Sequence, residues 1–338
     1  MGKGSPVLND ATARSWEDKF VDRNLALEMV RATEAAALAA ARWVGKGDAM
    51  SADQAAVAAM HATLGSIPFS GTVVLGEGER DLVPFLFNGE TVGLGGGSPF
   101  DLAVDAVECT RSVAFGRSNA MSVIALAPAG NFHLPPSQYV NKLAVGPDAT
   151  GAIDIRLSVE DNLYRVAEAL KYSVADLTVV ILDRERHTGL ISDVRRVGAR
   201  IHLIPDGDVA AAIATAIPGS GIDILMGVGN SAAGVLAAAA LRCLGGEIQA
   251  VAALSSENER IALRNAGLGD FGRVYHTWDL AGGDNVMFAA TGLTDGDVLN
   301  GVCYHADGAT THSLVIRSKT RTRRFIVTEH WFEDKPTY

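Results

Sequence analysis

Carboxylate side chains gather beside two apolar segments of this chain, where together they could hold a divalent cation. Glu77 and Glu79 lie on a glycine-interrupted turn that directly follows the first apolar segment. Asp105 and Glu108 follow the second segment, and Asp101 precedes it. Proteins of the α/β class bind ligands outside the carboxyl ends of their strands, and Mg²⁺ and Mn²⁺ prefer carboxylate oxygens and water. Either pair alone would be more typical of solvated turn residues, but the two clusters together predict a metal site.

Residues able to bind phosphate follow the same kind of segment. Thr110 and Arg111 stand at a predicted helix start, where backbone N–H groups and the helix dipole favour an anion. Arg184 and Arg186 follow another apolar segment and could grip a phosphate through paired hydrogen bonds. A simple helix cap at Thr110 and a solvated turn at the arginine pair are the alternative interpretations.

The elements that must position these residues alternate between helix and strand. The apolar spacing predicts a helix over 22–44 and a second helix over 51–64, which Ser51 would cap with Gln54 reaching back. From about residue 158 onward the alternation predicts βαβ crossovers and a sheet covered on both faces. Strands are predicted over 72–75, 102–104, 121–127, 178–182, 200–204, 222–226 and 248–254. An antiparallel tail with a turn at Asp307-Gly308 is predicted from 299–304, 313–317 and 324–328.

Length and composition predict a soluble, cytoplasmic protein. The 338 residues are 48% hydrophobic, and a break in the pattern at 146–151 suggests two lobes, residues 1–150 and 151–338. A net charge of −10 argues against a general nucleic-acid-binding surface. No apolar run reaches the roughly 18 residues of a membrane span, and the first residues lack the apolar core of a signal peptide. The three cysteines fit neither a disulfide framework nor a zinc pattern.

Two motifs resemble the class II fructose-1,6-bisphosphatase family. They are residues 76–81, Gly-Glu-Gly-Glu-Arg-Asp, and residues 101–110, Asp-Leu-Ala-Val-Asp-Ala-Val-Glu-Cys-Thr. The resemblance extends from about Arg23 to Asp334 and passes through Ser51-Ala52-Asp53, Tyr139, residues 204–208 and residues 290–292. It implies the layered αβαβα fold of the lithium-sensitive sugar and inositol phosphatases. In that fold an N-terminal lobe would carry the metal site and a C-terminal lobe would be rich in βαβ units.

The resemblance also implies roles for individual residues. Asp53, Glu77, Asp105 and Glu108 would hold Mg²⁺ or Mn²⁺, and Thr110 with Asp53 would orient the attacking water. Two metal ions can activate a water and stabilise the leaving oxygen of an in-line displacement. A homodimer or homotetramer is implied as the assembly. Contacts to the phosphorylated sugar would come from Glu108, Cys109, Thr110, Tyr139, Arg184, Arg186, Asp206, Asp208 and Asn230.

Several positions depart from the family pattern, and they fall at the site. Ala233 occupies the place of a metal-binding glutamate, so that one metal would lose a protein oxygen. Ala49 stands where many members have a basic residue, which removes a contact to phosphate. Cys109 replaces a glycine and would be strained if its φ were positive. Ala106 replaces a proline, and Leu82 stands where an acid is usual.

These departures leave three functions open. The first is a metal-dependent phosphatase of a sugar phosphate or bisphosphate, with an altered substrate or weakened metal use. The second is a lyase or dehydratase step on a phosphorylated or nucleoside-like sugar. The third is a non-catalytic sugar-phosphate sensor. Retention of the acids and of Thr110 favours the first.

Overall fold

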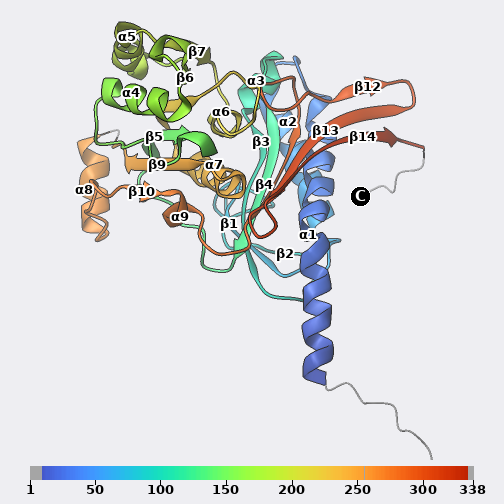
Figure 1. Cartoon of the computed structure of the whole chain (residues 1–338). Helices are drawn as coiled ribbons and strands as arrows, with labels where there is room; N and C mark the ends of the chain where they lie inside the picture. Colours follow the sequence, from blue (N-terminus) through green and yellow to red (C-terminus); the bar gives the residue numbers. More distant parts are fainter. Residues whose placement is uncertain (1–9, 255, 334–338) are drawn as a thin grey trace, which may run out of the picture.

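Two β-sheets, each covered by helices, form the scaffold of the protein (Figure 1). The computed structural model describes residues 10–254 and 256–333. Its α-helices are α1 (Asp10–Ala41), α2 (Ala49–Leu64), α3 (Thr110–Phe115), α4 (Val159–Leu170), α5 (Thr188–Val197), α6 (Asp208–Ala214), α7 (Ser231–Leu244), α8 (Glu257–Asn265) and α9 (Thr277–Leu280). Short 3₁₀ turns are η1 (Pro147–Ala149), η2 (Val174–Asp176) and η3 (Glu185–His187).

The strands contribute to one sheet or the other in an order that departs from the chain order. Those of the first sheet are β1 (Gly71–Leu75), β2 (Thr91–Val92), β3 (Phe100–Glu108), β4 (Met121–Pro128), β11 (Met287–Gly292), β12 (Cys303–His305), β13 (Gly308–Arg317) and β14 (Thr322–Trp331). Those of the second sheet are β5 (Tyr139–Val145), β6 (Thr178–Leu182), β7 (Arg200–Ile204), β8 (Ile224–Asn230), β9 (Glu247–Ala252) and β10 (Tyr275–His276).

The first sheet brings the ends of β1 and β3 to the same edge. The two strands are parallel, and Leu75 of β1 lies beside Ala103 of β3. Glu77, two residues beyond Leu75, therefore reaches the level of Asp105. The remaining strands follow the order β12-β13-β11-β4-β3-β1-β2, with β14 paired to β13, and the tail strands β12, β13 and β14 are antiparallel as expected.

The second sheet likewise gathers the carboxyl ends of its central strands. β6 runs parallel to both β7 and β8, so that the residues after Leu182, Ile204 and Asn230 leave the sheet at one edge. β5 is antiparallel to β8, and its first residue, Tyr139, pairs with Asn230. The predicted βαβ crossovers are thus present, within a mixed sheet of order β10-β9-β5-β8-β6-β7.

Five layers result, and α7 is the centre of the stack (Figure 1). α1 and α2 pack on the outer face of the first sheet, and α4 and α5 cover the outer face of the second. α7 contacts strands of both sheets and is rich in alanine, with the run 237–240 fully buried. Small side chains let a helix approach two sheets closely and still pack at interior density, so this sequence suits a helix enclosed on all sides.

Two sequence-based expectations about local structure are wrong. The cap of α2 is Asp48 and not Ser51, because the carboxylate of Asp48 accepts both the backbone N–H of Ser51 at 3.0 Å and its hydroxyl at 2.6 Å. An aspartate satisfies the free N–H groups of a first helical turn as well as a serine does, so the helix begins two residues earlier, at Ala49. Strand β5 was absent from the expected strands, because Asn141 and Lys142 interrupt its apolar pattern.

The division into residues 1–150 and 151–338 stays a prediction. The two sheets do not follow it, since β5 joins the second sheet and β11 to β14 return to the first. Within residues 10–254 and 256–333 there is no helix of sufficient length and apolarity to cross a membrane.

Candidate active site

Side chains at the strand ends of the two sheets meet across a short contact. The carboxylate of Glu108, at the end of β3, accepts the backbone N–H of Val209 at 3.1 Å. Val209 lies in the first turn of α6, directly after the Asp206-Gly207-Asp208 turn that follows β7. A Cβ added at Gly207 would stand 3.4 Å from the Sγ of Cys109. The acidic motif of one sheet and the aspartate turn of the other therefore form one site.

The carboxylates of Asp53, Glu77 and Asp105 lie near one another on the first sheet's side of the site, and they are largely shielded from water. Glu77 accepts the backbone N–H of Ala106 at 2.8 Å. Burial, with the charges of Asp105 and Asp53, raises the pKa of Glu77 to about 8. Burial and the neighbouring charge of Asp53 raise the pKa of Asp105 to about 7, and burial also raises the pKa of Asp53. Like charges held together in this way are stabilised when a cation lies between them.

Glu108 owes its position to an irregularity in β3. Asp105 lies opposite Val123 and Glu108 opposite Met121, so that three steps on β3 match two on β4. Residues three apart in a regular strand face opposite sides, and this bulge lets Asp105 and Glu108 face the aspartate turn together. Burial raises the pKa of Glu108 well above its usual value, and the charges of Asp208 and Asp105 add to the effect. Its second carboxylate oxygen, Oε2, is buried without a hydrogen-bond partner.

Asp208 is paired with a buried lysine that the sequence analysis did not single out. The Nζ of Lys142 lies 2.5 Å from Oδ2 of Asp208 and 3.2 Å from the carbonyl oxygen of Asn230, to which it donates. The Lys142 side chain is only 2% exposed. This ammonium group therefore joins β5, the aspartate turn and the start of α7. A lysine amid the apolar residues of β5 was the available signal.

We expect Lys142→Met to lower the free energy of unfolding by about 3 to 5 kcal/mol, because it leaves the buried Asp208 carboxylate without its partner. Urea denaturation would measure the loss. Asp208→Asn in the same background is the matched test: if the ion pair carries the effect, the double variant costs less than the sum of the two single variants. Additive costs would contradict this role for the pair.

The predicted sugar-side residues lie together at the carboxyl edge of the second sheet. Arg184 is 3.7 Å from the Asp206 carboxylate. The guanidinium of Arg186 donates twice to the carbonyl oxygen of Val228, at 2.8 and 3.2 Å, and lies 5.7 Å from the ring centre of Tyr139. Burial raises the pKa of Asp206, whereas the nearby charge of Arg184 lowers it. The edge thus presents two guanidinium groups beside a carboxylate and an aromatic ring.

His187 is a second residue that the sequence analysis missed, and it holds the arginine loop in place. Its Nδ1 lies 2.7 Å from the carbonyl oxygen of Leu182, and its Nε2 accepts the backbone N–H of Val228 at 2.8 Å. Burial lowers the pKa of His187, consistent with a neutral ring that donates through Nδ1 and accepts through Nε2. The ring therefore ties the end of β6 to β8, which carries the carbonyl that binds Arg186.

Cys109 and Thr110 form the turn between β3 and α3. Cys109 has φ 74° and ψ 48°, the left-handed conformation that glycine adopts without strain. The conditional expectation of strain at this position is thereby confirmed. Burial and the charge of Glu108 raise the pKa of the Cys109 thiol well above its usual value, so a reactive thiolate is not favoured. The hydroxyl of Thr110 lies 3.3 Å from the carbonyl oxygen of Val107, to which it donates.

Two departures from the family pattern occupy helix starts. Ala49 is the first residue of α2, next to its cap. Asn230 caps α7, and its side-chain oxygen accepts the backbone N–H groups of Ala232 at 2.7 Å and Ala233 at 3.4 Å. Ala233 is half-buried at the third position of the helix and packs against the central core. The sequence has a methyl group there, where the resemblance to the family implies a metal-binding glutamate.

The acids approach one another without forming a complete cage. In the described part of the chain no three His, Cys, Asp or Glu side chains already converge on one position as a ready-made metal site. The donor chemistry nevertheless suits a hard cation, because it consists of carboxylates and includes the unpartnered Oε2 of Glu108.

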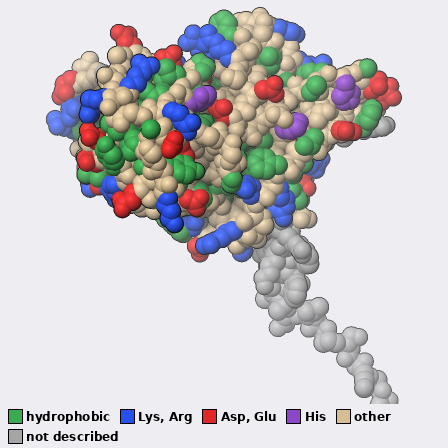
Figure 2. Space-filling view, turned by 45° about the horizontal axis from the view of Figure 1, so that its top comes forward, with side chains coloured by type: hydrophobic (Ala, Val, Ile, Leu, Met, Phe, Trp, Pro, Cys, Tyr) green, Lys and Arg blue, Asp and Glu red, His purple; other side chains and the backbone are tan. Residues whose placement is uncertain are grey.

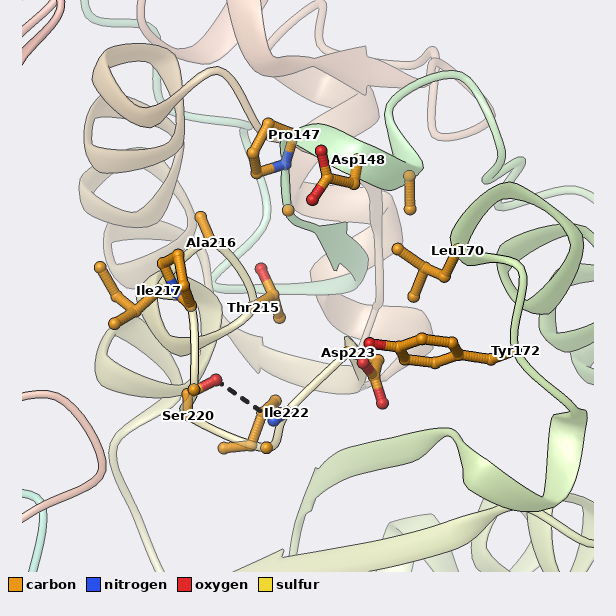
Figure 3. A pocket seen from close by; sticks show the side chains of 15 residues that line it. Pro147, Asp148, Leu170, Tyr172, Thr215, Ala216, Ile217, Ser220, Ile222 and Asp223 are labelled. Carbon is orange, nitrogen blue, oxygen red and sulfur yellow. Dashed lines mark hydrogen bonds between the residues drawn. The ribbon is translucent and has the colours of Figure 1, made fainter.

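A separate cavity of about 420 Å³ lies at the opposite end of the second sheet. Figure 3 shows it between Asp148, Tyr172, Thr215 and Asp223, with Ser220 bonded to the N–H of Ile222. This cavity lies at the edge of the second sheet where β8 begins, whereas the candidate site lies at the edge where β8 ends. One face of the surface bears interspersed acidic and basic side chains, with no continuous basic area (Figure 2).

Layers of helix and sheet alternate in this protein. Carboxylates lie at the strand ends of one sheet, and arginines and aspartates lie at those of the other. This arrangement is that of a layered α/β sugar-phosphatase fold. The sequence comparison gives the family. A family model described as "Bacterial fructose-1,6-bisphosphatase, glpX-encoded" matches residues 23–330, and the chain belongs to this family.

Curated relatives agree over nearly the whole length. The chain is 44% identical over 325 residues to "Fructose-1,6-bisphosphatase 1 class 2" of Escherichia coli (strain K12), covering 93% of this chain and 97% of that protein. The same values apply to "Fructose-1,6-bisphosphatase class 2" of Escherichia coli O6:H1 and of Shigella flexneri. The fold and family expected from the sequence are thus confirmed.

Proposed function

We propose that this protein is a divalent-metal-dependent phosphatase that hydrolyses a phosphate ester of a phosphorylated sugar, of the fructose-1,6-bisphosphatase type. One observation supports this most directly: the contact between Glu108 and Val209 joins the buried acids to the sugar-side turn. A substrate spanning that contact would place one phosphate at the acids and the sugar against the second sheet.

The proposed ligands of Mg²⁺ or Mn²⁺ are Asp53, Glu77, Asp105 and Glu108. Burial raises the pKa of all four carboxyl groups, and the charge of Asp53 adds to this at Glu77 and Asp105. Bound cations would offset both the burial and the repulsion. Divalent cations held by these carboxylates would supply Lewis-acid chemistry to the attacking water and to the leaving oxygen. The protein holds the carboxylates in place: the N–H of Ala106 orients Glu77, and the N–H of Val209 orients Glu108.

The second sheet would bind the rest of the substrate. Arg184 and Arg186 are proposed to hold the distal phosphate, since planar guanidinium groups match its oxygens in pairs. Tyr139, Asp206 and Asp208 would contact sugar hydroxyls, with Asn230 beside them at the start of α7. Glu108, Cys109 and Thr110 would line the other side.

Thr110 is proposed to orient the attacking water through its hydroxyl. We expect Thr110→Ala to lower kcat about 100-fold or more with little change in KM, because a positioned proton acceptor or donor contributes about 10²–10⁴ in rate. Thr110→Ser keeps the hydroxyl and is expected to stay close to the parent. Steady-state phosphate release would separate them, and an equal loss in both variants would oppose the role.

Phosphate release from a panel that includes fructose 1,6-bisphosphate, other sugar bisphosphates and monophosphates tests the function, with Mg²⁺ and with Mn²⁺. Release from one of them is expected. Absence of release from every compound at micromolar enzyme would overturn the proposal.

Ala233 supports one alternative, a lyase or dehydratase step on a phosphorylated or nucleoside-like sugar. Such a product would have lost water and kept its phosphate, which mass spectrometry distinguishes. A sensor without turnover is the third hypothesis; it predicts thermal stabilisation by the ligand alone. Cytoplasmic location and a homodimer or homotetramer stay predictions, for cell fractionation and sedimentation to test.

A further inference from the structure

A second pocket, of about 660 Å³, lies away from the acidic site, and three of its eight lining residues are arginines. One wall is the last turn of α7 with the residues just after it, Arg242 to Gly245, and Pro147 lies beside it. The other wall is the turn between β13 and β14, through Ser318, Arg321 and Arg323. A volume of this size suits a small phosphorylated molecule.

Three guanidinium groups line the pocket in a chain whose net charge is −10. The hairpin segment 317–324, Arg-Ser-Lys-Thr-Arg-Thr-Arg-Arg, holds five cations and no acid. Within the described ranges, Arg242, Arg321 and Arg323 form no ion pair closer than 4.0 Å. Cations gathered with no carboxylate at ion-pair distance repel one another, and an anion between them would relieve that repulsion.

Arg242 is preorganised for such an anion. Its guanidinium stacks 3.3 Å from the ring centre of Trp278, and its buried Nε has no hydrogen-bond partner. Burial lowers the pKa of Arg242 and the charge of Arg321 acts in the same direction, whereas Asp284 opposes it. A buried donor without an acceptor is costly, and a ligand oxygen would satisfy it.

Two of the neighbouring acceptors are already engaged by backbone N–H groups. The carbonyl oxygen of Leu241 at the end of α7 already accepts the N–H groups of Gly245 and Gly246, at 2.8 and 3.0 Å. The hydroxyl of Ser318 is likewise engaged, by the N–H of Val286 at 2.8 Å. The three guanidinium groups are the charged side chains that line the pocket, and planar guanidinium groups bind phosphate oxygens in pairs.

We propose that this pocket binds the phosphate group of a small phosphorylated metabolite at a site distinct from the acidic centre. α7 has 14 residues, so its two ends are separated by about 20 Å at 1.5 Å per residue. Ala233 and the candidate active site lie at its first turn, and the phosphate pocket lies at its last. The same helix, packed between the two sheets, spans both sites.

Calorimetric titration of the full chain with phenyl phosphate in EDTA tests the proposal. We expect binding that Arg321→Ala/Arg323→Ala weakens at least 10-fold, whereas Arg195→Ala, an exposed arginine on α5, leaves it unchanged. Both hairpin arginines are exposed, so the variant should fold. Arg321→Lys/Arg323→Lys keeps the charge but loses the paired geometry, and should fall between them.

Hydrogen exchange with the same ligand locates the site. Slowed exchange at 242–245 and 318–323 supports the proposal; protection confined to the acidic site, or equal affinity in the alanine variant and the Arg195→Ala control, overturns it. Inorganic phosphate serves as the second probe. Tighter binding of phenyl phosphate identifies an organic phosphate as the ligand, whereas equal affinity identifies free phosphate.

Discussion

Asp105→Asn is expected to lower metal-dependent phosphate release at least 100-fold in a folded chain. Asp105 lies on β3, where burial and the charge of Asp53 raise its pKa, and from this position it would bind a cation. The amide keeps the shape but provides a neutral, weaker oxygen ligand. Loss of groups that merely orient a metal ligand already costs about 10–100-fold. Phosphate release with Mg²⁺ and Mn²⁺ measures the effect, and Asp148→Asn, an exposed acid at the far end of the second sheet, is the control.

The same substitution is expected to stabilise the metal-free chain, and increasingly so as pH rises. The folded pKa of about 7 lies above the ordinary 3.8 of an aspartate. Between these values the folded state holds a proton that the unfolded chain releases, so the free energy of unfolding falls as pH rises from about 4 to 7. At about 1.36 kcal/mol per pKa unit, the three-unit difference limits the gain at pH 8 to about 4 kcal/mol.

Urea denaturation in EDTA at pH 5 and pH 8 checks this. The asparagine variant should gain relative to the parent at pH 8 and gain much less at pH 5. A difference independent of pH would show that Asp105 does not titrate as its surroundings require. Lost activity together with increased metal-free stability would identify Asp105 as a residue kept for function at a cost in stability.

Local chemistry was readable from the sequence, because it depends on neighbours along the chain. Apolar runs that end in acids predicted the ends of β1 and β3, and the strand–helix alternation predicted β6, β7 and β8. Pairings over long separations were not readable. Nothing in the sequence of β11 indicates that it pairs with β4, about 165 residues earlier, because such a pairing depends on the packing of the whole sheet.

The errors have equally specific physical causes. Lys142 was missed because its partner, Asp208, lies on a different element far along the chain. Asp48 and Ser51 are both good capping residues. In the structure the carboxylate of Asp48 accepts the backbone N–H of Ser51, so Asp48 is the cap. At Cys109 the sequence indicated a possible strain, and only the backbone φ of 74° decided that the strain is present.

Ala233→Glu is expected to lower the metal concentration for half-maximal phosphate release at least 10-fold. Ala233 is the third residue of α7, beside the capping Asn230 and at the edge that also presents Tyr139 and Asp208. A glutamate near a helix N-terminus is favoured by the helix dipole, so the variant should fold. It would supply the carboxylate oxygen that the resemblance to the family implies at this position, and a protein oxygen holds a divalent ion more tightly than a water in its place.

Ala233→Gln separates the charge from the shape. It has the same length and the same position on α7 but no negative charge, so it should gain little in metal affinity. Titration of Mg²⁺ and of Mn²⁺ against phosphate release compares the two variants with the parent. Equal gains in both would mean that the added bulk, and not a ligand, changed the site.

The result also decides between the proposed phosphatase and its main alternative. In a weakened phosphatase, one missing oxygen limits metal binding, so its restoration raises turnover at low metal. In a site rebuilt for loss of water, an added carboxylate brings a further negative charge to a site where Glu108 is already buried among like charges. That charge would raise the cost of ionising Glu108. Two results together would therefore assign Ala233 to the altered chemistry. The folded Ala233→Glu chain would show no gain in phosphate release, and its parent would yield a dehydrated product.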